Sequence, residues 1–215
     1  MMSPLSFVLA WLADPRRVAA VAQSSPALAA VITAEITPAA APIIELGPGT
    51  GVFTRALLDR GVAQDQLALI ENGSEFLGIL RTRFPDVNVL PMDADRLKEV
   101  ELFDGKRAGA VISGLPLLSM PPRKVMTILD GSFRHLRTGG AFYQFTYGPR
   151  CPVSRAILDR LGLKATRIGG TLANVPPAAV YRIRERPQRR RSETPRRVRP
   201  AARETLSNLP GGSQK

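Results

Sequence analysis

The chain of 215 residues contains one cysteine, Cys151, and one histidine, His135. A single cysteine excludes an internal disulfide framework and is typical of a protein from a reducing compartment. Structural zinc sites take four Cys or His ligands, so these two side chains are too few for such a site. We therefore expect no metal centre, and we assign no chemistry to His135.

The sequence also lacks a long apolar run. None of its apolar segments approaches the roughly 18–20 residues that a membrane-spanning helix needs. Residues 4–13 are apolar, but no Lys or Arg precedes them and no clear small-x-small cleavage site follows, so they do not resemble a signal peptide. In a helix Phe7 and Trp11 share a face, and Arg16 and Arg17 follow. This composition favours a helix at a membrane interface, and a helix that covers the domain core is the alternative.

Positive charge is spread unevenly over the chain, which carries a net charge of +12. Residues 182–215 hold 11 of the 30 basic side chains but 3 of the 18 acidic ones. Like charges and prolines in this segment predict disorder, and a basic segment suits a polyanionic partner, either nucleic acid or anionic lipid. We expect a helical N-terminal segment over residues 1–36, a folded domain over 37–186 and an Arg-rich tail over 187–215.

The most informative motif is a glycine-rich turn after an apolar run. Glu45 lies near the end of this run, and Gly47, Gly49 and Gly51 follow it with G-x-G-x-G spacing. Glycines at such a turn let the backbone approach a ligand closely, and the helix that begins there presents unpaired N–H groups. A dinucleotide fingerprint would need a third glycine where the chain has Val52. The spacing instead resembles motif I of the class I S-adenosylmethionine (SAM) methyltransferases.

Apolar strands and helical segments alternate along the chain after this motif. Such repeated units predict a parallel sheet with helices on both faces, and the last two strands lack a helix between them. The pattern is similar to the Rossmann-like class I methyltransferase fold, an α/β fold with a seven-stranded, mostly parallel sheet, here with an N-terminal helical extension. We expect strands over residues 42–46, 66–70, 87–90, 108–112, 141–146, 164–168 and 180–184, and helices over 52–59, 74–84, 122–136 and 153–161.

The predicted cofactor site lies beyond the carboxyl ends of these strands, where open parallel sheets bind their ligands. Glu71 ends the second strand, and its two carboxylate oxygens can accept hydrogen bonds from both hydroxyls of a ribose. Asp93 follows the third strand and can accept from an adenine amino group, although Asp95 competes for this role. Glu45 is expected to order the glycine loop or the methionine ammonium group. The residues predicted to bind the cofactor are Glu45, Gly47, Gly49, Gly51, Glu71, Asp93, Ala94, Ser113 and Gly114.

Two segments are candidates for the acceptor side of the site. Residues 113–118 follow the fourth strand; the Ser113 hydroxyl can accept a hydrogen bond from an amine, and the leucines make the site apolar, as a lipid acceptor requires. Alternation along the fifth strand places Tyr143, Phe145 and Tyr147 on one face. A tyrosine hydroxyl can orient an amine or help to remove its proton, so we name Tyr147, Tyr143 and Ser113 as candidate catalytic residues. Aromatic packing against the sheet is the alternative for the tyrosines.

Several strings together resemble the rhizobial-type bacterial phospholipid N-methyltransferases. Ser-Gly-Leu-Pro-Leu-Leu at 113–118 and Gln-Phe-Thr-Tyr-Gly-Pro at 144–149 are more specific to this family than the glycine loop. Leu172 departs from the family, whose members often have an aromatic residue there, and the Arg-rich tail is not part of its pattern. The other matching strings lie at residues 11–17, 21–25, 45–54 and 173–178.

The resemblance implies an enzyme that methylates phosphatidylethanolamine with SAM toward phosphatidylcholine, and it allows the mono- and dimethyl derivatives as further acceptors. It implies phosphatidylethanolamine and anionic lipids as partners rather than nucleic acid, and a peripheral location on the cytoplasmic face of the inner membrane. Phe7, Trp11, Arg16 and Arg17 would then bind the membrane, with residues 1–36 covering the cofactor. Two alternatives stay open: an enzyme related to the rRNA adenine dimethyltransferases, and a lipid-binding protein without turnover.

Overall fold

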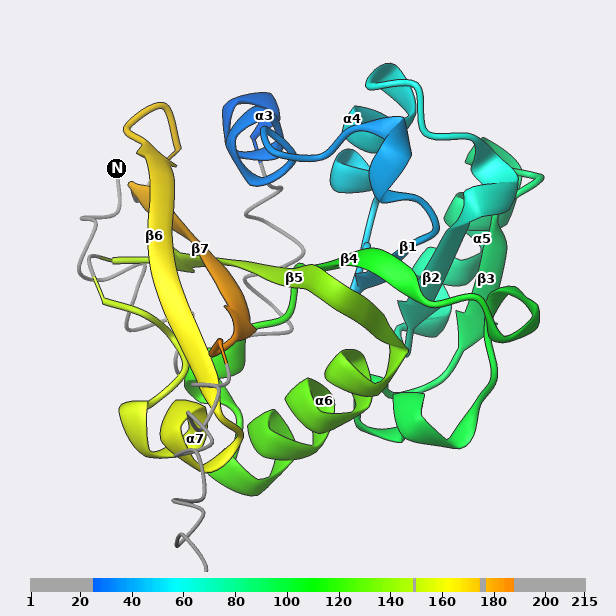
Figure 1. The fold of residues 1–215 in the computed structure, drawn as a ribbon. Helices are drawn as coiled ribbons and strands as arrows, with labels where there is room; N and C mark the ends of the chain where they lie inside the picture. The colour runs from blue at the N-terminus through cyan, green and yellow to red at the C-terminus, as the bar shows by residue number, and fades with distance from the viewer. Residues whose placement is uncertain (1–24, 149, 175–176, 188–215) are drawn as a thin grey trace, which may run out of the picture.

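The computed structural model describes residues 25–148, 150–174 and 177–187 (Figure 1). The predicted membrane-binding residues Phe7, Trp11, Arg16 and Arg17 lie outside the described residues, as does the tail from residue 188 onward. Within the described part of the chain, no helix is both long and apolar enough to cross a bilayer.

Seven strands of the described chain form one sheet, in the order β3-β2-β1-β4-β5-β7-β6. The first five strands pair in parallel, whereas β7 runs antiparallel to β5 and β6. The predicted α/β fold with a mostly parallel sheet of seven strands is thus confirmed. The strands are β1 (Ile43–Leu46), β2 (Leu67–Glu71), β3 (Asn88–Pro91), β4 (Ala108–Ser113), β5 (Leu136–Tyr147), β6 (Leu163–Thr171) and β7 (Ala178–Glu185).

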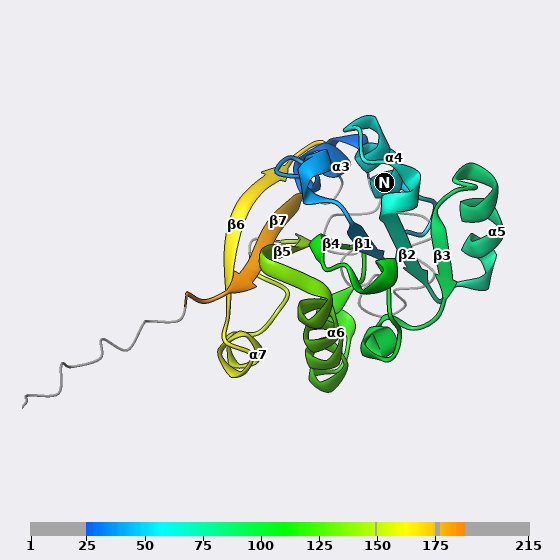
Figure 2. The same ribbon diagram turned by 45° about the vertical axis from the view of Figure 1, so that its right-hand side comes forward.

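Helices cover both faces of the sheet (Figures 1 and 2). On one face α3 (Pro26–Ile32), α4 (Val52–Asp59) and α5 (Ser74–Arg83) bury their apolar side chains in one hydrophobic cluster. On the other face α6 (Pro122–His135) and α7 (Arg155–Arg160) contribute to a second cluster. Short 3-10 helices lie in the connections: η1 (Pro38–Ala40), η2 (Gln64–Gln66), η3 (Ala94–Glu99), η4 (Phe103–Gly105) and η5 (Leu117–Ser119).

Strand β5 begins earlier than the sequence predicts. The sequence predicts a helix over 122–136 and a strand only from residue 141, because residues 137–140 combine a basic residue with two glycines, as helix ends often do. Instead α6 ends at His135, and Leu136 is already extended and pairs with Ala108 of β4. A register shift follows before the main ladder resumes at Ala110 and Ala141. The pairing partner of Leu136 lies far away in the sequence, which is why local signals could not reveal the strand.

Helix α3 begins with a capping serine followed by proline. Ser25 is the N-cap, and its hydroxyl accepts a hydrogen bond from the Leu28 N–H at 3.1 Å, with Pro26 in the first helical position. The Ser25 N–H in turn donates to Asn174 Oδ1 at 3.2 Å. The first turn of α3 is therefore tied to the loop that connects β6 and β7.

Replacing Ser25 with alanine should lower the free energy of unfolding by about 1 kcal/mol, because the Leu28 N–H loses its capping acceptor. Urea denaturation of wild type and Ser25→Ala would measure the difference. Ser74→Ala is the matched control, since Ser74 is exposed at the start of α5 and makes no capping hydrogen bond. Equal losses in the two variants would contradict a capping role for Ser25.

Candidate functional site

The glycine loop connects β1 to α4 in a left-handed backbone conformation. Gly47, Gly49 and Gly51 have φ angles of +65°, +55° and +82°, which residues with a Cβ rarely adopt. A Cβ at Gly51 would lie 2.4 Å from Phe84 Cε2, and one at Gly47 would lie 2.7 Å from Leu115 Cδ2. At Gly49 no atom lies within 4 Å of such a Cβ, so this part of the loop faces open space.

Glu71 holds the glycine loop from the end of β2. Its Oε2 accepts a hydrogen bond from the Gly49 N–H at 3.0 Å, and its Oε1 accepts from the Gly73 N–H at 2.7 Å. The side chain is largely buried, with 8% of the residue exposed. The carboxylate therefore links the loop after β1 to the turn after β2, and it lies at the strand end where the sequence predicts the ribose contact.

Glu45 is buried on β1, the strand that leads into the glycine loop. Its Oε2 accepts a hydrogen bond from the Thr54 hydroxyl at 2.7 Å, whereas Oε1 has no hydrogen-bond partner among the described residues. Burial raises the pKa of Glu45 to about 7; the Thr54 hydrogen bond opposes this shift, and the charge of Glu71 adds to it. The orphaned oxygen makes Glu45 a site where a cationic or hydrogen-bonding ligand group would be stabilised.

Asp93 follows β3 and forms an ion pair that the sequence did not reveal. Its Oδ2 lies 2.5 Å from Nζ of Lys124 on α6, and its Oδ1 accepts from the Asp95 N–H at 3.2 Å. Partial burial raises the pKa of Asp93, but the Lys124 ammonium and the Asp95 N–H outweigh it, so that the pKa lies below its ordinary value. Asp95 lies 3.6 Å from the same ammonium group. Ala94 lies between these two residues in the sequence and is buried at the start of η3.

Ser113 and Gly114 support the glycine loop from the end of β4. The Gly114 N–H donates to the Leu46 carbonyl at 2.8 Å, and a Cβ at Gly114 would lie 2.5 Å from the Gly47 oxygen. Ser113 is fully buried, and its hydroxyl accepts from the Leu115 N–H at 3.3 Å. Both residues thus lie at the predicted edge, but the Ser113 hydroxyl is turned into the protein, and its contact with an amine remains a prediction.

The two candidate tyrosines lie in different environments. As predicted, Tyr143, Phe145 and Tyr147 belong to the same side of the sheet, and Phe145 packs edge-on against Tyr147 with ring centroids 5.3 Å apart. Tyr143, however, pairs with Ile112 one residue before the end of β4, and its hydroxyl donates to Glu35 Oε2 at 3.1 Å. Arg182 of β7 donates to the other oxygen of Glu35 at 2.7 Å. This network links the sheet to the turn after α3, and a catalytic role for Tyr143 remains a prediction.

Tyr147 ends β5 and therefore lies at the same edge as the glycine loop. Burial raises the pKa of its hydroxyl, and a hydrogen bond with the Asn174 side chain opposes the shift without cancelling it. Asn174 is buried and also accepts from the Ser25 N–H. Asn174 and Lys124 are the two polar residues of this edge that our site prediction missed, although Asn174 lies within one of the strings that resemble the phospholipid N-methyltransferases.

The carboxyl edge of the sheet brings most of the predicted residues together. Glu71 is hydrogen-bonded to the glycine loop, Gly114 packs against Gly47 of that loop, and the charge of Glu71 acts on Glu45. Asp93 lies at the end of the neighbouring β3, and Tyr147 lies on the opposite side of the loop at the end of β5. In the described parts of the chain, no group of three or more His, Cys, Asp or Glu side chains could hold a metal ion.

The chain resembles curated methyltransferases in sequence, whereas no protein-family model matches it. An ornithine lipid N-methyltransferase from Singulisphaera acidiphila is 29% identical over 143 residues, which cover 65% of this chain and 73% of that protein. The ribosomal RNA small subunit methyltransferase A of Porphyromonas gingivalis is 35% identical over 79 residues. That match covers 36% of this chain and 30% of the rRNA enzyme, so it spans a small part of either protein.

Solved structures of methyltransferases share the fold. The 1,6-didemethyltoxoflavin-N1-methyltransferase of Burkholderia thailandensis, solved with S-adenosylhomocysteine and its acceptor, superposes with a TM-score of 0.58. The alignment covers 86% of this chain and 91% of that one, at 14% sequence identity. This likeness confirms the predicted Rossmann-like methyltransferase fold.

The raised pKa of Glu45 predicts that stability depends on pH. Because folding raises this pKa from 4.5 to about 7, the folded state binds the proton more tightly than the unfolded state. The contribution of Glu45 to the free energy of unfolding is therefore greatest below pH 4.5. It falls by on the order of 2–3 kcal/mol as the pH rises to 7. Glu45→Gln, which stays neutral, should gain stability relative to wild type over this range.

Urea unfolding at several pH values between 4.5 and 8 would measure this difference. Glu75→Gln is the control, since Glu75 is exposed on α5. If the difference between wild type and Glu45→Gln stayed constant with pH, Glu45 would not be the titrating group.

Proposed function

We propose that this protein is a SAM-dependent N-methyltransferase whose acceptor is the amine of a membrane lipid. The observation that carries the proposal is the buried Glu71 carboxylate, hydrogen-bonded to Gly49 of a left-handed glycine loop at the carboxyl edge of the sheet. The similarity to an N-methyltransferase of a lipid, over about two thirds of this chain, supports the acceptor class. The structural neighbour solved with S-adenosylhomocysteine supports SAM as the cofactor.

The residues of the edge fit such a cofactor. The open space over Gly49 leaves room for a ligand against the loop backbone. Glu71 can accept from the ribose hydroxyls, Asp93 from the adenine amino group, and the orphaned Oε1 of Glu45 from the methionine ammonium group. A cation beside Glu45 would also lower its pKa, because a nearby positive charge favours the ionised carboxylate.

Tyr147 is the residue that we expect to handle the acceptor amine. When bound, SAM supplies an electrophilic methyl group, which a neutral amine attacks while the carbon–sulfur bond breaks. Since the pKa of Tyr147 is raised, its hydroxyl stays protonated at neutral pH and is suited to orient the amine rather than to remove its proton. Positioning and exclusion of water would then provide most of the rate enhancement.

Phosphatidylethanolamine is the acceptor that we propose first, on the residue strings at 113–118 and 144–149. Ornithine lipid is the second candidate, because the lipid methyltransferase that resembles this chain is described by that substrate. Both acceptors carry a primary amine on a lipid, and both would be reached at a membrane surface. We propose that the basic and aromatic residues Phe7, Trp11, Arg16 and Arg17 hold the enzyme on the cytoplasmic face of the inner membrane.

Replacing Glu71 with glutamine should weaken binding of S-adenosylhomocysteine by about 10- to 100-fold, since hydrogen bonds to a charged group contribute roughly 1.5–3 kcal/mol. Isothermal titration calorimetry on the full chain would measure the dissociation constant. Glu75→Gln, an exposed change on the following helix, should leave the affinity within about twofold of wild type. Unchanged affinity in correctly folded Glu71→Gln would remove Glu71 from the cofactor site.

A methyl-transfer assay distinguishes the acceptors. The full chain is incubated with SAM labelled in its methyl group and with vesicles of phosphatidylethanolamine, vesicles that contain ornithine lipid, or 16S ribosomal RNA. We expect label in phosphatidylethanolamine, and at least a tenfold lower rate for Tyr147→Phe.

The other outcomes of this assay choose between the alternatives. Label in ornithine lipid alone would replace phosphatidylethanolamine as the proposed acceptor, while the proposed class of lipid methyltransferase would stand. Label in RNA would reject a lipid acceptor. Retained S-adenosylhomocysteine binding with no labelled acceptor in any arm would contradict the proposed activity.

A further inference from the structure

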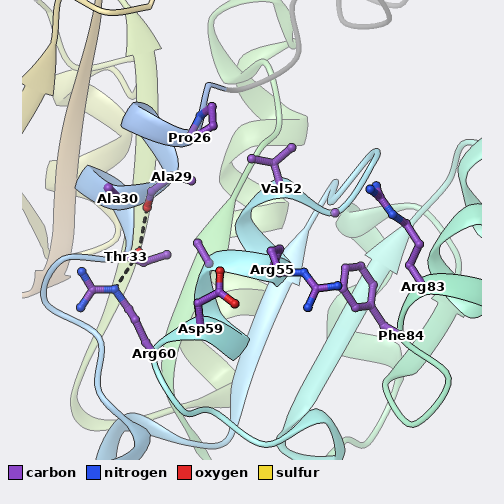
Figure 3. Close-up of a pocket in the computed structure, with 12 residues that line it drawn as sticks. Pro26, Ala29, Ala30, Thr33, Val52, Arg55, Asp59, Arg60, Arg83 and Phe84 are labelled. Carbon is purple, nitrogen blue, oxygen red and sulfur yellow. Dashed lines mark hydrogen bonds between the residues drawn. The ribbon is translucent and has the colours of Figure 1, made fainter.

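A cleft opens between α3 and α4, beside the glycine loop, whose Gly51 lines it. Its volume is about 440 Å³, in the lower half of the roughly 300–1,000 Å³ that small-molecule sites occupy. Figure 3 shows that α3 forms one wall, and that the side chains of α4 and of the end of α5 form the other. The apolar lining consists of Pro26, Ala29, Ala30, Val52, Ala56 and Phe84.

Basic side chains surround this apolar lining. Arg55, Arg60 and Arg83 line the cleft together with one acidic residue, Asp59. Figure 3 shows Arg55 and Arg83 beside Phe84 at one end, and Arg60 and Asp59 at the other. Among the described residues none of the three guanidinium groups forms an ion pair. The end near Phe84 therefore carries two positive charges without a neighbouring carboxylate partner.

The arginines of the cleft are held in place while donors remain free. Arg83 Nη1 donates to the Thr50 carbonyl at 2.7 Å, and the Arg55 guanidinium lies 5.5 Å from the centre of the Phe84 ring. Arg60 Nε donates to Thr33 Oγ1 at 3.0 Å at the end of α3. A guanidinium group has five N–H donors, so Arg55 and Arg83 keep several for a ligand. This preorganisation lowers the entropy that an anion would lose on binding.

We infer that the cleft binds a single-chain amphiphile that ends in a phosphate monoester. The phosphate, with a charge of about −1.5 to −2 at neutral pH, matches the two guanidinium groups of Arg55 and Arg83. The acyl chain lies along the alanines of α3 and α4, where it buries apolar surface. The volume suits one chain and not two. Since Arg83 donates to the Thr50 carbonyl and Gly51 lines the cleft, this ligand would lie against the glycine loop.

Calorimetric titration of the full chain with 1-lauroyl lysophosphatidate below its micelle concentration tests this site. We expect saturable binding, at least tenfold tighter than that of 1-lauroyl lysophosphatidylcholine, which has the same chain but no net charge. Arg55→Gln should weaken lysophosphatidate binding about tenfold, because it removes a charge-assisted donor. Ala30→Trp, which fills the cleft and leaves every charge in place, should weaken it by a similar factor.

Arg81→Gln is the matched control, since Arg81 is exposed on α5 and does not line the cleft. It should change the affinity less than twofold, and thermal unfolding would verify that each variant is folded. Equal affinity for the two lipids, or binding that both Arg55→Gln and Ala30→Trp leave intact, would overturn the inference. Equally tight binding of glycerol 3-phosphate would show that the acyl chain does not contribute to binding. The titration contains no SAM, so its result is independent of the proposed methyl transfer.

Discussion

The left-handed glycine loop and the carboxylate that holds it are the constraint on which the rest of the site depends. Glu71 joins the loop after β1 to the turn after β2 through the N–H groups of Gly49 and Gly73. Phe84 lies too close to Gly51, and Leu115 lies too close to Gly47, for either position to carry a Cβ. These contacts fix the ends of β1 and β2 relative to the start of α4. The backbone at Gly49 stays open to a ligand.

This arrangement places two carboxylates close to each other in a buried region. Burial raises the pKa of Glu45, and the charge of Glu71 raises it further, so the site disfavours a second negative charge. A ligand whose hydroxyl groups donate to Glu71 and whose cation lies beside Glu45 would offset two costs. These are the burial of Glu45 and its repulsion from Glu71. These two carboxylates thus favour a ligand with a positive charge and hydroxyl donors over an anionic one.

The parts of the structure that the sequence predicts are those with local causes. Helix α4 has its predicted bounds, Val52–Asp59, because the glycine turn and the apolar periodicity lie within a dozen residues of each other. Contacts between distant segments could not be foreseen. The pairing of Tyr143 with Glu35 and that of Lys124 with Asp93 span 108 and 31 residues, and neither follows from a pattern along the chain. The role of Tyr143 was therefore the least predictable part of the site.

Helix α3 connects the regions of the molecule that we consider functional. Its first turn is linked through Asn174 to Tyr147, at the acceptor side of the sheet edge. Its last turn is held by Arg60, and its outer side forms the wall of the arginine-lined cleft. A shift of α3 would change the contact with Asn174 and the width of the cleft together, because one short helix takes part in both. Helix α3 is therefore an element that the end of β5 and the cleft share.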